Sequence, residues 1–150
     1  MNELLLEAHE ELKRLEHIVY VSLKYTRTVD VIVNAVNRMV STYDFTIAAF
    51  LEKAKEEGRI DSAPKSPALQ AKKLAELYPD DATIQKNLTF YFNLRTILKS
   101  AHLKKHEFRR HVTLLVELER SNIEIEIDTL VSCERFIHKF LYYARSIIDG

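Results

Sequence analysis

Residues that make turns are scarce in this sequence, which has only two glycines and three prolines among its 150 residues. A β-sandwich or β-barrel needs a turn about every 8–12 residues, and its turns depend largely on these residue types. The sequence also has no glycine-rich loop of the kind that holds a phosphate or a dinucleotide. These absences exclude an all-β fold and argue against the P-loop and dinucleotide-binding classes.

The single cysteine, Cys133, excludes an internal disulfide framework and a cysteine-based zinc finger. A lone thiol is typical of a reducing compartment. The first residues lack the basic and apolar regions of a secretory signal, and charges interrupt every apolar stretch before about 18 residues. We therefore expect a cytoplasmic protein with no membrane-spanning helix and no membrane partner.

An excess charge of either sign is also missing, because 22 basic residues balance 22 acidic residues. The net charge therefore gives no hint of a nucleic-acid partner. Hydrophobic residues make up 47% of the chain, which is too many for intrinsic disorder. The length predicts a single domain over residues 1–150. The low glutamine content beside abundant Glu, Lys, Arg and Ile favours a thermophilic source.

Apolar residues recur every three or four positions along most of the chain, which predicts amphipathic helices. The predicted helices span residues 2–25, 28–57, 67–77, 82–102 and 129–148. A linker over residues 58–67 holds two of the three prolines. The expected N-caps are Asn2, Thr28, Ser66 and Asp128, and Gly58 is expected to end the second helix.

The pattern changes after residue 107, where Ile123, Ile125 and Ile127 alternate with glutamates. A period of two residues is typical of a strand with one buried face. A short run rich in β-branched residues precedes it, over 112–116, and a polar connector separates the two segments. We predict a β-hairpin at about 108–127 rather than a continuous helix, which would scatter the isoleucines around its axis.

The expected fold is therefore mainly α, an up-and-down bundle of four to five helices with this β-hairpin before the last helix. An isolated hairpin is only marginally stable in water, so we expect it to pack on the helices or to pair with another chain.

Arg95 and His102 lie seven residues apart on the predicted helix 82–102. This spacing is nearly two helical turns, so both side chains would project from one face, with Lys99 between them. An arginine can hold a phosphate through two hydrogen bonds, and a histidine can transfer a proton near neutral pH. Such a pair can cleave RNA without a metal, and the alternative is two solvent-facing helix residues.

An arginine, four to six residues and then a histidine resembles the ribonuclease motif of the HEPN superfamily of small α-helical proteins. Six residues separate Arg95 from His102. The resemblance implies a helical fold and catalytic roles for these two residues. The sequence differs from the family at Thr96, where Asn, Asp or His is usual, and in the hairpin that follows. Many HEPN-like proteins are thought to be inactive binding or antitoxin-type modules.

Residues 99–111 form a basic segment in the otherwise balanced chain. Its candidate RNA-binding residues are Lys99, Lys104, Lys105, Arg109 and Arg110. Such a segment can follow a phosphate backbone. The alternative is a solvated helix end followed by the charged edge of a strand.

Two further polar groups are candidate sites. Asp30, Asn34 and Arg38 follow a four-residue spacing on the second helix, and Arg27 comes just before it. This group indicates either a polar site between helices or a solvated face. His102 and His106 have a spacing that can share a metal, but they lack suitable partners. We expect no metal and no cofactor.

Two function hypotheses follow. The first is a non-catalytic helical interaction module that self-associates as a homodimer or binds a protein partner, because two long helices and a hairpin leave apolar surface to cover. The second is a HEPN-type RNA-binding protein or a metal-independent ribonuclease that uses Arg95 and His102. We favour the first, and whether the protein is an enzyme stays open.

Overall fold

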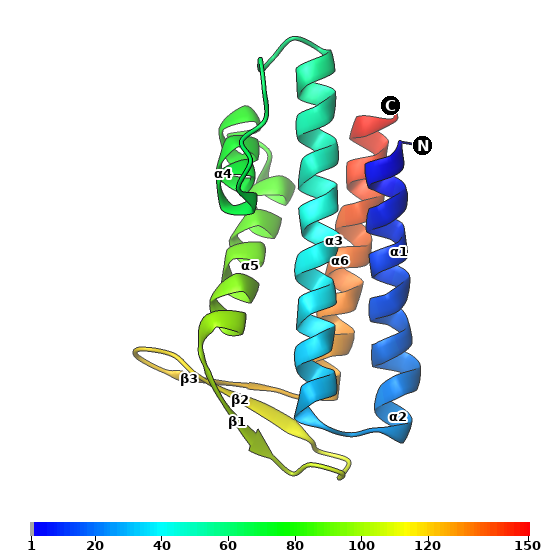
Figure 1. Cartoon of the computed structure of the whole chain (residues 1–150), viewed down its shortest axis with the longest axis vertical. Helices are drawn as coiled ribbons and strands as arrows, with labels where there is room; N and C mark the ends of the chain where they lie inside the picture. The colour runs from blue at the N-terminus through cyan, green and yellow to red at the C-terminus, as the bar shows by residue number, and fades with distance from the viewer. Residues whose placement is uncertain (1) are drawn as a thin grey trace.

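The computed structural model describes residues 2–150, which form an up-and-down bundle of helices with a small sheet at one end (Figure 1). The helical elements are α1 (Glu3–His17), the π-helical turn η1 (Ile18–Ser22), α2 (Leu23–Tyr25), α3 (Val29–Glu56), α4 (Pro67–Leu77), α5 (Ala82–Lys99) and α6 (Ile127–Ile148). The strands are β1 (Ala101–Lys105), β2 (Thr113–Glu117) and β3 (Asn122–Ile125). The mainly α fold class and the strand pair before the last helix are confirmed. No helix within residues 2–150 is both long and apolar enough to cross a bilayer.

Side-chain caps fix the starts of most helices. Asn2, Thr28 and Ser66 each accept a hydrogen bond from the backbone N–H three residues later, as predicted. The predicted cap of the last helix, Asp128, is wrong, because α6 begins earlier with Glu126 as its N-cap. The Glu126 N–H donates to the hydroxyl of Thr129 at 3.2 Å, which places Asp128 in the first turn.

The first predicted helix, over residues 2–25, is not uniform. At η1 the N–H of Leu23 donates to the carbonyl of Ile18, five residues earlier rather than four. This π-helical turn accommodates one extra residue, so the side chains that follow it point in different directions from those that a regular α-helix would give them. The helix then ends at Tyr25, close to the predicted boundary.

The second predicted helix ends where the sequence indicated. Gly58, just after α3, has a φ of 75°, in the left-handed region that favours glycine.

The centre of the core is the fully buried Tyr43 on α3. Its ring packs against Tyr91 of α5 and Phe140 of α6, with ring centroids 5.8 and 5.7 Å apart. Its hydroxyl donates a hydrogen bond of 2.6 Å to Oδ1 of the buried Asn87. Burial raises the pKa of Tyr43, so the hydroxyl stays protonated and available as a donor.

The sheet has the order β1-β2-β3, and both strand pairs are antiparallel. Leu114 and Val116 of β2 are fully buried, so one face of the sheet packs on the end of the bundle. Of the three alternating isoleucines, only Ile125 is buried. Ile123 and Ile125 lie opposite the buried Val116 and Leu114, so these two isoleucines share one face of the sheet as predicted. Ile123 is nevertheless 37% exposed, and Ile127 already belongs to α6 rather than to the strand.

Strand β1 was not predicted, and the predicted helix 82–102 is too long by three residues. The helix ends at Lys99 because Ser100 adopts an extended backbone, with φ −88° and ψ 162°. The following residues then form a ladder with β2, in which Leu103 is opposite Leu115. Pairing with a distant strand therefore overrides the helix-forming preference of this segment.

We expect Tyr43→Phe to lower the free energy of unfolding by about 1–3 kcal/mol, because the buried Oδ1 of Asn87 would have no donor. Denaturant unfolding of the two proteins measures this difference. Tyr25→Phe is the matched control, since Tyr25 is 85% exposed and its change should stay within about 0.5 kcal/mol. Equal stability changes in the two variants would contradict a structural role for the Tyr43 hydroxyl.

Candidate functional site

The connector between β1 and β2, residues 106–112, lies at the sheet end of the bundle, near the start of α3 (Figure 1). The N–H of Phe108 donates to the carbonyl of Arg27 at 2.7 Å. A carboxylate oxygen of Glu107 accepts from the N–H of Val29 at 2.9 Å, so Glu107 helps to cap α3. These contacts fix the connector on the segment that precedes α3.

Two non-glycine residues of the connector have left-handed backbones, with φ 56° at His106 and 64° at Phe108. This conformation costs roughly 1–2 kcal/mol per residue. The hydrogen bonds of Glu107 and Phe108 to the start of α3 offset that cost. The connector is therefore held in one shape by its contacts and not by its own conformational preference.

Two adjacent hollows, of about 360 and 510 Å³, open on this end of the molecule and share Arg110, His111 and Glu126. We call the surface that they form the basic end. Its cationic and imidazole side chains are Lys24, Arg27, Lys105, His106, Arg109, Arg110 and His111. Its carboxylates are Glu124, Glu126 and Asp128. The basic end is thus assembled from α2, the segment before α3, the end of β1, the connector, β3 and the start of α6.

Most carboxylates here have partners. Lys105 pairs with Glu124 at 3.1 Å, and Lys104 pairs with Asp30 at 3.6 Å, just outside the hollows. Glu107 accepts from the start of α3, and Glu126 takes part in the capping box at the start of α6.

Four cations of the basic end have no ion-pair partner among the described residues 2–150. They are Lys24, Arg27, Arg109 and Arg110. The N-termini of α3 and α6 also lie at this end, and their dipoles add positive potential. The result is a surface that attracts anions on a molecule with no net charge.

The connector also carries an exposed aromatic side chain, which does not line either hollow. Phe108 is 77% exposed and lies in the chain between the glutamate that caps α3 and the two unpaired arginines 109 and 110. Exposed aromatic rings beside cations are typical of sites that stack a nucleic-acid base.

Arg95 and His102 do not share a helix face, because α5 ends before His102 and places it on β1. Arg95 donates to the Tyr91 hydroxyl at 3.2 Å, and that hydroxyl donates to Asp44 at 2.5 Å. Burial raises the pKa of Asp44, while the Tyr91 hydrogen bond and the charge of Arg95 oppose the rise.

The ring of His102 is used within its own segment. Its Nε2 lies 2.8 Å from the carbonyl of Ile97, so that nitrogen is a donor to the last turn of α5. Lys99 is exposed in the same turn. No hydrogen bond joins Arg95 to His102 among residues 2–150.

The predicted inter-helix polar group is divided between three places. Arg27 lines the basic end, where its Nε is buried without a hydrogen-bond partner. Asp30 is exposed and pairs with Lys104. Asn34 and Arg38 line a shallow hollow against α1, and Arg38 pairs with Glu11 at 3.1 Å. These four side chains therefore do not form one site.

Sequence reasoning missed two contributions. Lys24, far from the basic segment 99–111 in the sequence, joins the basic end because the fold brings α2 next to the connector. A separate group, Glu16, Glu134 and His138, brings ligand atoms within 4.8 Å of one another. Its only signal in the sequence is the four-residue spacing of Glu134 and His138. Burial raises the pKa of the Cys133 thiol to about 11, which keeps it in the less reactive protonated form at neutral pH.

We expect His102→Ala to lower the free energy of unfolding by about 0.5–1.5 kcal/mol, because the Ile97 carbonyl loses one of its two donors and keeps only the Ser100 N–H at 3.2 Å. Denaturant unfolding of the wild type and the variant measures this change in the free energy of unfolding. His111→Ala is the control, because its exposed side chain makes no hydrogen bond in the described chain, and its change should stay within about 0.5 kcal/mol. An unchanged stability for His102→Ala would argue against this structural role and leave His102 free for chemistry.

The resemblance to the HEPN superfamily rests on Arg95 and His102 and stays a prediction. A comparison of the chain with family models, with curated proteins and with solved structures found no match. The basic end is the strongest guide to function, because several unpaired cations of the described residues gather there.

Proposed function

We propose that the protein is a non-catalytic helical module that binds single-stranded RNA through its basic end. The observation that carries this proposal is the group of four unpaired cations around the two adjacent hollows. Arginine is suited to phosphate because its planar guanidinium forms two parallel hydrogen bonds with the phosphate oxygens. Three of the four cations are arginines: Arg27, Arg109 and Arg110.

The exposed ring of Phe108 favours the binding of single-stranded RNA over the binding of a duplex. Unpaired bases stack on exposed aromatic side chains, whereas the bases of a duplex are already stacked on one another. Phe108 directly precedes Arg109 in the fixed connector, and its ring is exposed, so a base stacked on Phe108 would have its phosphate close to the arginines of the basic end. The open shape of the hollows also suits a chain that passes through them.

The contacts of Arg95 and His102 support binding without catalysis. Each side chain already has a partner inside the protein, the Tyr91 hydroxyl for Arg95 and the Ile97 carbonyl for His102. A metal-independent ribonuclease needs both groups on the same phosphodiester. The connector of the basic end, by contrast, holds its cations without using them in ion pairs.

Wild-type protein should bind a labelled oligouridine with an affinity that falls steeply as salt is added. In the variant Arg109→Ala/Arg110→Ala, the slope of log affinity against log salt should decrease by about 0.7 for each phosphate that the variant no longer neutralises. Phe108→Ala should weaken binding by about 1–3 kcal/mol and leave this slope unchanged, because stacking releases no counterions. Fluorescence anisotropy in the presence of a chelator measures both quantities.

The control for this experiment is Lys65→Ala/Lys72→Ala, which removes two exposed cations near α4, away from the sheet end (Figure 1). It should bind as the wild type does. The proposal fails if the wild type does not bind, or if the control loses as much affinity as the arginine variant. Cleavage of the RNA in the chelator would favour the ribonuclease alternative instead.

Self-association is a separate part of the proposal. Strand β1 is at the edge of the sheet, and its Leu103 side chain is 50% exposed. An unpaired strand edge beside an exposed leucine is a surface on which a second copy can add a strand.

We expect a particle of twice 17.5 kDa by light scattering at micromolar concentration. Leu103→Lys should shift it to the monomer, because it places a charge in the interface between the two copies. Leu69→Lys, at an equally exposed leucine of α4, should leave the mass unchanged. A wild-type monomer would contradict the homodimer.

A further inference from the structure

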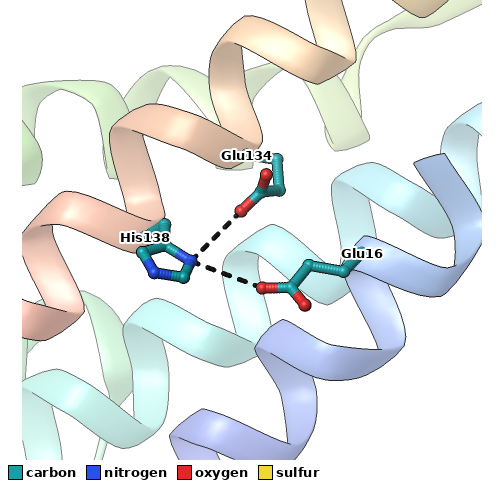
Figure 2. Close-up of side chains that lie close together, drawn as sticks. All are labelled: Glu16, Glu134 and His138. Carbon is teal, nitrogen blue, oxygen red and sulfur yellow. Dashed lines mark ion pairs between the residues drawn. The ribbon is translucent and has the colours of Figure 1, made fainter. Parts of the chain in front are cut away.

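Two helices that face each other bring three metal-ligating side chains together at one point (Figure 2). Glu16 comes from the end of α1, and Glu134 and His138 lie one turn apart on α6. Nδ1 of His138 is 3.3 Å from Oε1 of Glu16 and 3.5 Å from Oε2 of Glu134. Figure 2 shows both carboxylates turned toward the same nitrogen of the imidazole ring.

Glu134 is the unusual member of the group. Its side chain is only 6% exposed, and its Oε2 is buried with no hydrogen-bond partner. A carboxylate oxygen in such a place costs free energy unless something compensates its charge. Among residues 2–150, His138 is the only ion-pair partner of Glu134. The orphan oxygen is therefore aimed at the centre of the cluster with its coordination incomplete.

The two distances fit metal ligands better than hydrogen-bonded partners. A hydrogen bond between a charged donor and a carboxylate is about 2.7–2.9 Å long. Ligand atoms on adjacent corners of a tetrahedral Zn²⁺ site, with bonds of about 2.0–2.2 Å, are about 3.3–3.6 Å apart. The measured 3.3 and 3.5 Å lie in the second range.

We infer that Glu16, Glu134 and His138 form a binding site for one divalent transition-metal ion, for which Zn²⁺ is the probe. The ligand atoms are Nδ1 of His138 and one oxygen of each carboxylate. The imidazole favours Zn²⁺ over Mg²⁺ and Ca²⁺, which prefer sites made only of oxygen. Because His138 is 57% exposed and Glu16 is 38% exposed, a fourth position is open to water or to an external ligand.

Tyr20 positions the buried ligand. Its hydroxyl donates to Oε1 of Glu134 at 2.8 Å, which leaves Oε2 as the oxygen for the metal. Hydrogen bonds to ligating carboxylates orient them and tune their affinity for the metal. Tyr20 lies in the π-helical turn η1, and such turns occur frequently at functional sites. This site shares no residue with the histidine pair at 102 and 106.

The experiment is a calorimetric titration of the untagged full chain with Zn²⁺ after removal of metals by a chelator and dialysis. The wild type should bind one Zn²⁺ per chain. His138→Ala and Glu134→Gln should each weaken the affinity by at least about 100-fold, because each loses a ligand. Tyr20→Phe should weaken it by about 10-fold while one ion per chain still binds, since it removes only an orienting hydrogen bond.

The matched control is His106→Ala, which removes a histidine of the basic end and should leave the affinity unchanged. Co²⁺ gives a second readout, because a four-coordinate site produces intense visible absorption that His138→Ala should abolish. Circular dichroism checks that each variant is folded. If Glu134→Gln unfolds, His138→Ala remains the test of the site, because the side chain of His138 is exposed and its loss should not disturb the fold. The inference is overturned if the wild type does not bind Zn²⁺ stoichiometrically, if His138→Ala binds as tightly, or if His106→Ala removes the binding.

Discussion

The burial of α3 is the constraint on which the rest of the structure depends. This helix packs against α1, α4, α5, α6 and β2, so its side chains must satisfy neighbours on nearly every side. Tyr43 does this at the centre, with its ring among aromatic residues and its hydroxyl on Asn87. The position of α3 also fixes where its first N–H groups lie, and Glu107 reaches them from the connector. Packing in the core therefore determines the shape of a surface at the end of the bundle.

Both candidate sites arise from the way carboxylates are distributed among partners. At the basic end, glutamates 107 and 126 are engaged at the starts of helices, and this leaves arginines 109 and 110 without counter-ions. Between α1 and α6 the opposite holds, because Glu134 is buried with an oxygen that no donor reaches. The basic end therefore has cations without counter-ions, and the cluster between α1 and α6 has a carboxylate oxygen without a donor, although the net charge of the chain is zero.

Features set by neighbours in the sequence, such as helix bounds and caps, could be predicted from the sequence. Features set by contacts between distant segments, such as strand pairing, could not. The bounds of α4 and the cap at Thr28 follow from local chemistry, and both are confirmed. Strand β1 was missed because its ladder partners come at least eight positions later, and this error also put Arg95 and His102 on one helix. Glu16 and Glu134 are far apart in the chain, so only the packing of α1 on α6 reveals that they meet.

The π-helical turn gives the first helical segment two different phases. An α-helix advances about 100° per residue, so the residue accommodated in η1 rotates everything after it relative to everything before it. Glu16 and Tyr20 are four residues apart, a spacing that shares a face even in a regular helix, and both reach α6. The offset acts on the residues after the turn, beginning with the buried Leu23. Deleting one residue from η1 would rotate Leu23 by about 100° relative to α1, so relatives of this chain that keep a buried residue there should keep the length of this turn more strictly than its residue types.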